Sequence, residues 1–278
     1  MRINTNINSM RTQEYMRQNQ DKMNTSMNRL SSGKRINSAA DDAAGLAIAT
    51  RMRAKENGLG VASRNTQDGI SLIRTADSAL NSVSNILLRM RDLAVQSANG
   101  TNSNDDRAAT GAEFTQLIEQ IDYIATNTAF NGTKLLNNTA PNGKVSIKTY
   151  DDGGATNIDI KLTDVQKGSL TGDGKKLNAL KVDTDVNAKD AVKAIDGMIN
   201  SIASDRADLG ATLNRLDFNV ANLNSQASSM ASSASQIEDA DMAKEMSEMT
   251  KFKILNEAGI SMLSQANQTP QMVSKLLQ

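Results

Sequence analysis

The chain has 278 residues, with 31 basic and 31 acidic side chains, two Pro, three Tyr, four Phe and no His, Cys or Trp. Zinc fingers, thiol or Ser-His-Asp hydrolases and disulfide-rich scaffolds are excluded, because the side chains that they need are absent. A net charge of zero argues against a dedicated nucleic-acid-binding protein.

The sequence contains no apolar stretch of the roughly 20 residues that a membrane-spanning helix requires. The first ten residues, MRINTNINSM, are too rich in Asn and Thr to form the apolar core of a signal peptide. We therefore expect no membrane partner, and we do not expect the general secretory route.

The N-terminal segment, residues 1–30, has apolar residues at near-helical spacing, and many of them are Met. Because methionine is flexible, it suits surfaces that pack in more than one arrangement. The segment predicts a helix that belongs either to an ordinary bundle or to an assembly surface. The residues assigned to that surface are Ile3, Ile7, Met10, Met23, Met27 and Leu30.

Two helices are predicted in the next hundred residues. Apolar residues recur at steps of three and four over residues 73–94, which is typical of a long helix with a packing seam. This seam includes Leu80, Val83 and Leu87. A shorter amphipathic helix is predicted at residues 114–125, between turn-rich sequences at 99–104 and 131–132.

Residues 141–182 have a different pattern. Val145 and Ile147, and then Ile158 and Ile160, alternate with polar neighbours on either side of a turn at residues 151–154. This alternation predicts a β-hairpin with one apolar face. Since an isolated hairpin is barely stable in water, we expect it to lie on the helices and not to form a separate catalytic domain.

The strongest periodicity lies in residues 209–237. A single helix over residues 190–237 would be about 70 Å long, whereas a compact globule of this chain length has a diameter of roughly 50 Å. We therefore expect a mainly α fold, an elongated coiled-coil-like rod with a small β-hairpin. The seam residues of this helix are Leu209, Leu213, Leu216, Val220 and Leu223.

Residues 242–277 again carry apolar residues with several Met, so they predict a second terminal helix. Residues 1–35 are basic and residues 238–278 slightly acidic, which indicates that the two ends complement each other as paired helices. The residues assigned to assembly here are Met242, Met246, Met249, Leu255, Met262 and Leu276.

No catalytic constellation emerges. Neighbouring carboxylates diverge on a helix or turn, so the acidic pairs are expected to start helices or to lie in solvated turns. These pairs are Asp41-Asp42, Asp105-Asp106 and Asp151-Asp152. The sequence from Asp151 onward does not match a calcium-binding EF-hand loop, because Thr156 and Leu162 stand where that loop needs Gly and Glu. We expect no enzyme, no catalytic residues, no cofactor and no metal.

Two motifs at opposite ends resemble a known family. Residues 28–48, NRLSSGKRINSAADDAAGLAI, closely resemble the N-terminal conserved region of bacterial flagellins. Residues 237–243, IEDADMA, with QANQ at 265–268 and PQ at 270–271, resemble the flagellin C-terminal region. The resemblance covers nearly all of the chain except residues 140–190.

This resemblance implies a structural subunit that polymerises with itself into the extracellular flagellar filament, which is used for swimming. Residues 1–43 and 237–278 would pair as a terminal coiled-coil domain lining the inner tube. Residues 44–236 would form a long-helix bundle in the outer tube, with the β-hairpin at about 141–182. The chain resembles the short type, which lacks a large outer domain.

The resemblance also implies partners. Hook-filament junction and cap proteins would adjoin the filament, and an export chaperone would bind the C-terminal segment before the chain leaves through the flagellar secretion channel. Residues 88–96 resemble the helix by which certain flagellins bind an animal Toll-like receptor. Arg89, Leu93 and Glu113 match the contact positions of those flagellins, while Arg89 and Leu93 also suit packing between subunits.

Two alternatives stay open at this point. A hook-associated cap or junction protein shares helical termini with flagellins but seldom both full motifs, and electron microscopy of the purified protein would separate it from a self-polymer. A flagellar enzyme is disfavoured by the absence of His and Cys.

Overall fold

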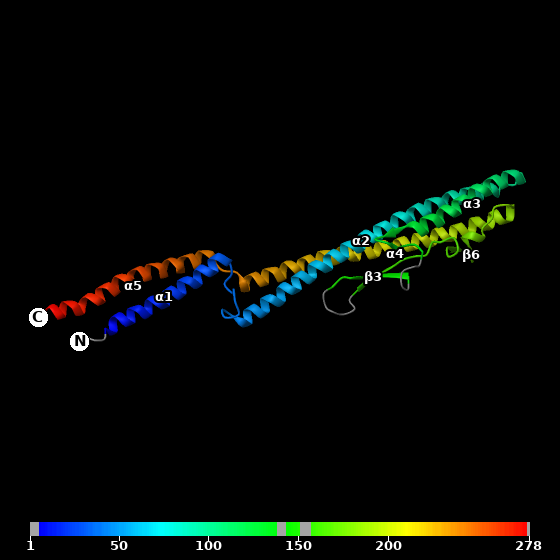
Figure 1. The fold of residues 1–278 in the computed structure, drawn as a ribbon. Coiled ribbons are helices and arrows are strands. Elements are labelled where there is room, and N and C mark those ends of the chain that lie inside the picture. Colours follow the sequence, from blue (N-terminus) through cyan, green and yellow to red (C-terminus); the bar gives the residue numbers. More distant parts are fainter. Residues whose placement is uncertain (1–5, 138–142, 151–156, 277–278) are drawn as a thin grey trace. The chain divides into compact units, whose positions relative to one another are not determined.

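The computed structural model describes residues 6–137, 143–150 and 157–276, with side chains up to residue 268. Long helices dominate these residues (Figure 1). They are α1 (Ile7–Ser32), α2 (Ala43–Ser97), α3 (Asn104–Asn127), α4 (Asp185–Glu238) and α5 (Met242–Leu276). The predicted mainly α fold is confirmed. None of the described helices is apolar enough over a sufficient length to span a membrane.

The described strands are short and pair two by two in antiparallel fashion. The pairs are β1 (Ala129–Phe130) with β2 (Thr133–Lys134), β3 (Lys144–Lys148) with β4 (Asn157–Lys161), and β5 (Thr171–Gly172) with β6 (Lys175–Lys176). A 3-10 turn, η2 (Leu177–Ala179), follows β6.

The chain divides into two compact units. Unit 1 combines Met1–Glu56 with Ser228–Gln278, and unit 2 is Asn57–Ala227. The boundaries fall inside α2 and α4, so each of these helices contributes to both units.

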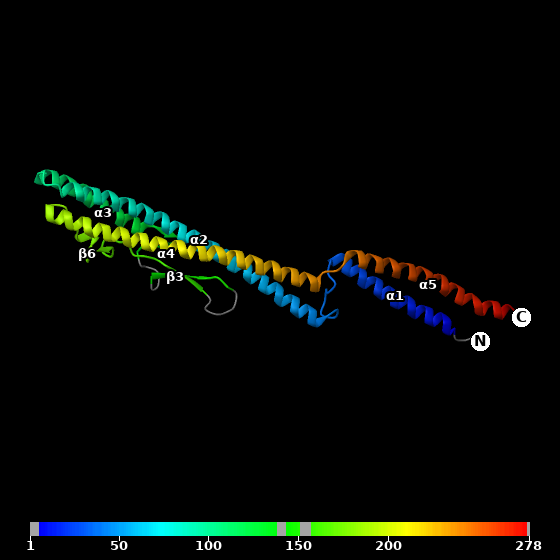
Figure 2. The same cartoon turned by 180° about the vertical axis from the view of Figure 1, so that it is seen from behind.

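The core of unit 2 lies between α2, α3 and α4, which run alongside one another (Figure 2). Each large aliphatic side chain buried here stabilises the unit by about 1.5–3 kcal/mol. Fully buried members are Leu80, Val83 and Leu87 on α2, Phe114 and Ile121 on α3, and Ile195 and Leu216 on α4.

The predicted hairpin is present as β3 and β4. Val145 pairs with Ile160, and Ile147 pairs with Ile158, so the alternating apolar residues share one face. Ile160 is fully buried, and Gly69 of α2 leaves space for Ile147, whose Cγ1 would lie 3.1 Å from a Cβ at position 69. The hairpin therefore packs on the helices as expected, while its predicted turn at 151–154 lies outside the described residues.

The second hairpin, β5–β6, differs from the expectation of one hairpin over residues 141–182. Its strands contain only Thr, Gly and Lys, so they lack the apolar alternation that identifies a strand. The turn is made by Asp173 and Gly174, both with positive φ. Gly172 touches α4 so closely that a Cβ there would overlap the carbonyl oxygen of Ala194.

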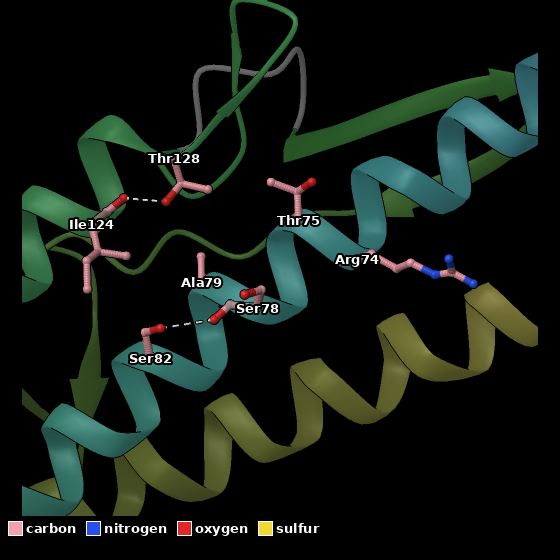
Figure 3. A pocket seen from close by; sticks show the side chains of 7 residues that line it. All are labelled: Arg74, Thr75, Ser78, Ala79, Ser82, Ile124 and Thr128. Atoms are coloured by element: carbon pink, nitrogen blue, oxygen red, sulfur yellow. Dashed lines mark hydrogen bonds between the residues drawn. The ribbon is translucent and has the colours of Figure 1, made fainter.

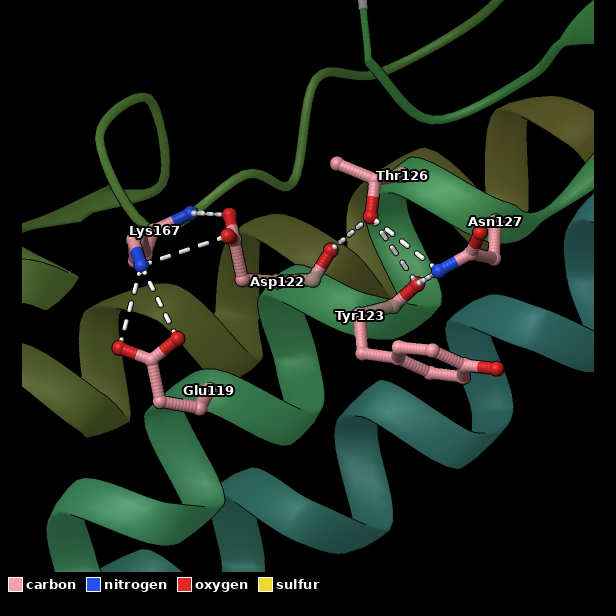
Figure 4. Close-up of polar contacts among 6 residues, drawn as sticks. All are labelled: Glu119, Asp122, Tyr123, Thr126, Asn127 and Lys167. Carbon is pink, nitrogen blue, oxygen red and sulfur yellow. Dashed lines mark hydrogen bonds and ion pairs between the residues drawn. The ribbon is translucent and has the colours of Figure 1, made fainter.

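The loop before β5 is tied to α3 by Lys167 (Figure 4). Its Nζ lies 3.1 Å from both carboxylate oxygens of Glu119 and 3.4 Å from Oδ2 of Asp122. These hydrogen bonds, first of all the one with Glu119, raise the pKa of Lys167. Because the cluster is exposed to solvent, it fixes the position of the loop more than it stabilises the unit.

Two of the acidic pairs start helices, as predicted. Asp42 accepts a hydrogen bond of 2.9 Å from the backbone N–H of Gly45 at the start of α2. Ser103 and Asp106 form a capping box at the start of α3, and the bond from Ser103 lowers the pKa of Asp106. The third pair, Asp151-Asp152, lies outside the described residues.

Candidate functional site: the paired terminal helices

Helices α1 and α5 of unit 1 lie side by side and antiparallel (Figure 1). Asn6 donates to the carbonyl of Ala266 at 2.8 Å, and Asn256 donates to Gln20 at 2.6 Å. Nearer the other end of α1, Arg29 forms an ion pair of 3.2 Å with Glu245. Contacts therefore run along most of both helices, with residue numbers rising in one and falling in the other.

The seam between the two helices follows a heptad pattern. The residues of α5 that face α1 are partly or fully buried and recur at steps of four and three, as in a coiled coil. They are Glu245, Met249, Phe252, Asn256, Gly259, Leu263 and Ala266. The matching residues of α1 are Ser9, Thr12, Met16, Asn19, Met23, Ser26 and Leu30.

This seam is rich in polar and small side chains. Ser26 and Glu245 are buried in it, and Gly259 lies against Met16. Burying polar groups gives little of the stabilisation that Leu or Ile would provide at the same positions. The α1–α5 pair is therefore weakly held by its own seam.

Several further large apolar side chains lie outside the seam. At about 100° per residue, Met246 and Ile260 stand on one flank of α5 and Leu255 and Met262 on the other. All four are exposed. Ile254 is exposed on the back of the same helix. The pair thus presents apolar surface in several directions, which is typical of a protein that packs against more than one neighbour.

The structure divides the predicted assembly residues into two groups. Met23, Leu30 and Met249 lie in the seam and are half-buried. The others described are exposed: Ile7, Met10, Met27, Met242, Met246, Leu255 and Met262. Ile3 and the side chain of Leu276 lie outside the described residues.

A backbone bridge joins the two connections of unit 1, and sequence analysis did not identify it. Lys34 pairs with Asp239 as an isolated antiparallel bridge, and Ala240 N–H donates to the carbonyl of Gly33 at 3.0 Å. The guanidinium of Arg35 donates to the carbonyl of Ile237 at 2.9 Å. The family motifs at 28–48 and 237–243 therefore meet here, which gives a structural reason for their joint presence.

The predicted rod-seam residues lie in unit 2, and all except Leu223 belong to its core or pack against it. Leu80, Val83, Leu87, Leu209, Leu216 and Leu223 are buried, and Leu213 and Val220 are partly buried against the core.

The predicted receptor residues are split between surface and core. Arg89 of α2 and Glu113 of α3 form an exposed ion pair, with Arg89 Nη2 at 2.7 Å from Glu113 Oε1. Leu93 is only 2% exposed. It belongs to the core of unit 2, whereas Leu88, which precedes Arg89 in the sequence, is exposed.

The grooves of unit 2 show no reactive constellation among the described residues. A groove of about 580 Å³ runs between α2 and the end of α3 and is lined mostly by small side chains (Figure 3). The hydroxyls of Thr75, Ser82 and Thr128 donate to carbonyls four residues earlier in their own segments. No group of three or more acidic residues that could hold a metal occurs in the described part of the chain.

The family model for the bacterial flagellin N-terminal helical region matches residues 3–140, and that for the C-terminal helical region matches residues 192–277. A flagellin from Listeria innocua is 51% identical over 285 residues, which cover 100% of this chain and 99% of that protein. The chain belongs to the bacterial flagellin family.

Further relatives agree with this assignment. A flagellin from Bacillus subtilis is 40% identical, with both chains covered completely. The crystal structure of Bacillus cereus flagellin is 42% identical with a TM-score of 0.51, over 62% of this chain and 94% of that chain. A Vibrio parahaemolyticus protein described as flagellar hook-associated shares the fold, with a TM-score of 0.61 and 16% identity, over 72% of this chain and 100% of that chain.

Membership in the flagellin family makes this chain a structural protein of the extracellular flagellar filament, which serves motility, and not an enzyme. Full-length identity to flagellins favours a filament subunit over the cap or junction alternative. The likeness to the hook-associated protein concerns the fold alone.

Proposed function

We propose that the α1–α5 pair is the surface through which copies of this flagellin pack into the filament. The observation that carries the proposal is the apolar surface that unit 1 leaves exposed. Many positions of the seam hold polar or small residues such as Ser26, Asn256 and Gly259, while several large apolar side chains lie on the flanks. Covering those flanks with neighbouring subunits removes apolar surface from water and so stabilises the pair.

The two flanks of α5 suit an open polymer. A helical filament needs heterologous contacts, in which one face of a subunit meets a different face of the next. Met246 and Ile260 on one flank, and Leu255 and Met262 on the other, provide two such faces. In the filament, residues 1–43 and 237–278 would line the inner tube, and residues 44–236 would form the surrounding shell.

Single charges on each flank test the proposal. Ile260→Glu and Met262→Glu each place a carboxylate in a contact that assembly would bury, so the critical concentration for polymerisation should rise by about tenfold or more. Sedimentation and electron microscopy of the full chain provide the measurement. Met262→Leu, which keeps an apolar side chain, is the matched control. Normal filaments from both Glu variants would refute the proposal.

The same exposed surface suits the partners that act before and at the ends of assembly. We propose that an export chaperone covers the apolar residues of α5 before the chain enters the flagellar secretion channel. Hook-filament junction and cap proteins would meet the same terminal pair at the filament ends. Met262→Glu should therefore weaken chaperone binding in a pull-down with the purified chaperone, and unchanged binding would contradict this part.

A second function, recognition by an animal Toll-like receptor, is proposed for the surface around Arg89 and Glu113. The resemblance of residues 88–96 to receptor-binding flagellins and the exposure of this ion pair support it. Leu93 is buried and would act by anchoring α2 in the core.

Arg89→Ala tests receptor recognition. It should lower activation of a receptor reporter by monomeric protein, whereas Arg74→Ala, at another exposed arginine of the same helix, should not. Equal activation by the wild-type chain and Arg89→Ala would reject this role.

A further inference from the structure

The methionines of this flagellin differ in solvent exposure between the terminal helices and the core of unit 2. The described methionines with largely exposed side chains all lie on the terminal pair: Met10, Met27, Met242, Met246 and Met262, which are 47–65% exposed. Met90 and Met198, in the core of unit 2, have no exposed surface. Among the described residues, the thioethers most open to solvent therefore lie on the proposed assembly surface.

Within the part of the chain that the structure describes, these thioethers are the most easily oxidised groups open to solvent, since the sequence has no Cys and no Trp. Hydrogen peroxide transfers one oxygen atom to methionine Sδ as the O–O bond breaks, and the other oxygen leaves as water. The sulfur is oxidised by two electrons and the peroxide is reduced by two. The product, methionine sulfoxide, is polar and chiral, and sulfoxide reductases return it to the thioether.

We infer that the five exposed methionines form a redox-sensitive site at which oxidation to the sulfoxide prevents the subunit from polymerising and reduction restores it. This inference rests on the proposed function of the α1–α5 pair. A sulfoxide buried between two subunits loses its hydrogen bonds to water, which disfavours the contact. Met246 and Met262 stand on opposite flanks of α5, so oxidation would weaken contacts with neighbours on both sides.

Assembly should in turn protect the same methionines. Once the flanks are covered by neighbouring subunits, peroxide can no longer reach the sulfur atoms. Oxidation would then act on free subunits and leave existing filaments intact. Met90 and Met198 should stay reduced in both states, so they provide internal references.

The experiment uses the full chain, kept monomeric and treated with dilute hydrogen peroxide. Peptide mass spectrometry should find sulfoxide at the five exposed methionines and not at Met90 or Met198. Circular dichroism should show that the helices are retained. The critical concentration for polymerisation should rise by about tenfold or more. Treatment with sulfoxide reductases for both sulfoxide epimers should reverse the rise.

Two variants separate the exposed sites from general oxidative damage. In a variant with all five exposed methionines changed to Leu, the ratio of critical concentrations with and without peroxide should be close to one. Met198→Leu, which changes a buried methionine, should keep the full loss on oxidation. Each variant is compared with its own untreated sample, so a change in its basal assembly does not affect the ratio.

Two results would overturn the inference. One is a chain that is oxidised at all five positions and polymerises at an unchanged critical concentration. The other is a fivefold Leu variant that loses assembly as strongly as the wild-type chain. If the untreated chain assembles and both flank variants, Ile260→Glu and Met262→Glu, also assemble normally, the proposed function fails instead.

Discussion

The Nζ atom of Lys34 lies 3.1 Å from Oε2 of Glu238, whose residue is only 5% exposed. Arg53 approaches the same oxygen at 3.5 Å. One buried carboxylate at the end of α4 therefore holds two cations, one from the connection between α1 and α2 and one from the first turns of α2. Lys34 also forms the backbone bridge with Asp239, the residue that follows Glu238.

Glu238→Gln should destabilise unit 1 by about 1–3 kcal/mol, because it keeps the shape of the side chain but leaves two cations without their shared counter-charge. Urea unfolding followed by circular dichroism measures the change. Glu257→Gln, at an exposed position of α5, is the control and should change stability by less than about 0.5 kcal/mol. Equal stability of the two variants would show that the cluster contributes nothing.

Gly259 lies opposite Met16 in the terminal seam, and a Cβ at Gly259 would stand 2.7 Å from Met16 Cγ. Gly259→Leu should therefore push α1 and α5 apart, and amides of α1 should exchange with deuterium faster. Adding Met16→Ala makes room and should restore part of the protection, with a coupling energy of about 0.5–3 kcal/mol. If the two substitutions act additively, the seam does not bring these residues together.

Sequence periodicity predicts the long helices well, because α2, α3 and α4 bury regular apolar stripes. It does not predict the terminal seam equally well. Near the N-terminus the most hydrophobic residues of the pattern include Ile7, Met10 and Met27. In the structure these side chains are exposed, whereas Ser26 is buried. A heptad beginning at Ser9 is present in the sequence, but its members are mostly polar. Hydrophobic pattern alone therefore does not separate the seam between the two helices from their exposed flanks.

Leu216 and Phe218 are two residues apart on α4 but have opposite environments. Leu216 is fully buried in unit 2, whereas Phe218 is 77% exposed. Leu216→Asp should unfold much of unit 2, since an unpaired charge in the core costs several kcal/mol. Phe218→Asp should leave the monomer's helicity and thermal midpoint nearly unchanged. Circular dichroism of both variants checks this, and an unaltered spectrum for Leu216→Asp would contradict the core assignment.

Asp205 predicts a pH dependence of unit 2. Burial, and then the nearby Asp208, raise the pKa of Asp205 above its ordinary value, against a hydrogen bond from Thr163 that lowers it. The Oδ2 atom of Asp205 is buried, and no described residue donates a hydrogen bond to it. Asp205 lines a groove that Lys144 and Lys161 also line. The folded state therefore prefers the protonated acid, and stability should fall as pH rises from the ordinary pKa through the raised one.

Asp205→Asn removes this penalty, so it should raise the thermal midpoint at neutral pH and lose its advantage in acid. Asp190 is the control, because its pKa is shifted in the opposite direction: the hydrogen bond with Lys175 lowers the pKa of the Asp190 carboxyl. Asp190→Asn should lower the midpoint at neutral pH, with the difference vanishing as pH falls through the lowered pKa. Parallel pH profiles for the two variants would argue against these environments.

Gly172 and Gly210 predict opposite effects of the same substitution. A Cβ at Gly172 would overlap the carbonyl oxygen of Ala194 on α4, so Gly172→Ala should displace the β5–β6 hairpin and destabilise unit 2 by more than about 1 kcal/mol. Gly210 has open space in the interior of α4, and Gly210→Ala should stabilise by about 0.4–1 kcal/mol. Thermal unfolding measures both effects: the midpoint should fall for Gly172→Ala and rise for Gly210→Ala.

The β5–β6 hairpin and the Glu238 cluster show what the sequence could not provide. Thr171, Lys175 and Lys176 form strands because Gly172 fits against α4, a contact that no local pattern encodes. Glu238 is buried because two cations distant in sequence reach it. Both features depend on residues that only the tertiary fold brings together. A helix cap such as that of Ser103 and Asp106, in contrast, can be recognised from a sequence of four residues.

The hydrogen bond from Asn6 to Ala266 joins residues 260 positions apart. Contacts of such high sequence separation form late, because the intervening chain must be brought into place first. During synthesis, α1 emerges long before α5 exists, and it stays without that companion until α5 has been added. A partly made chain therefore cannot close its own ends, and the first helix is available to other binders throughout elongation.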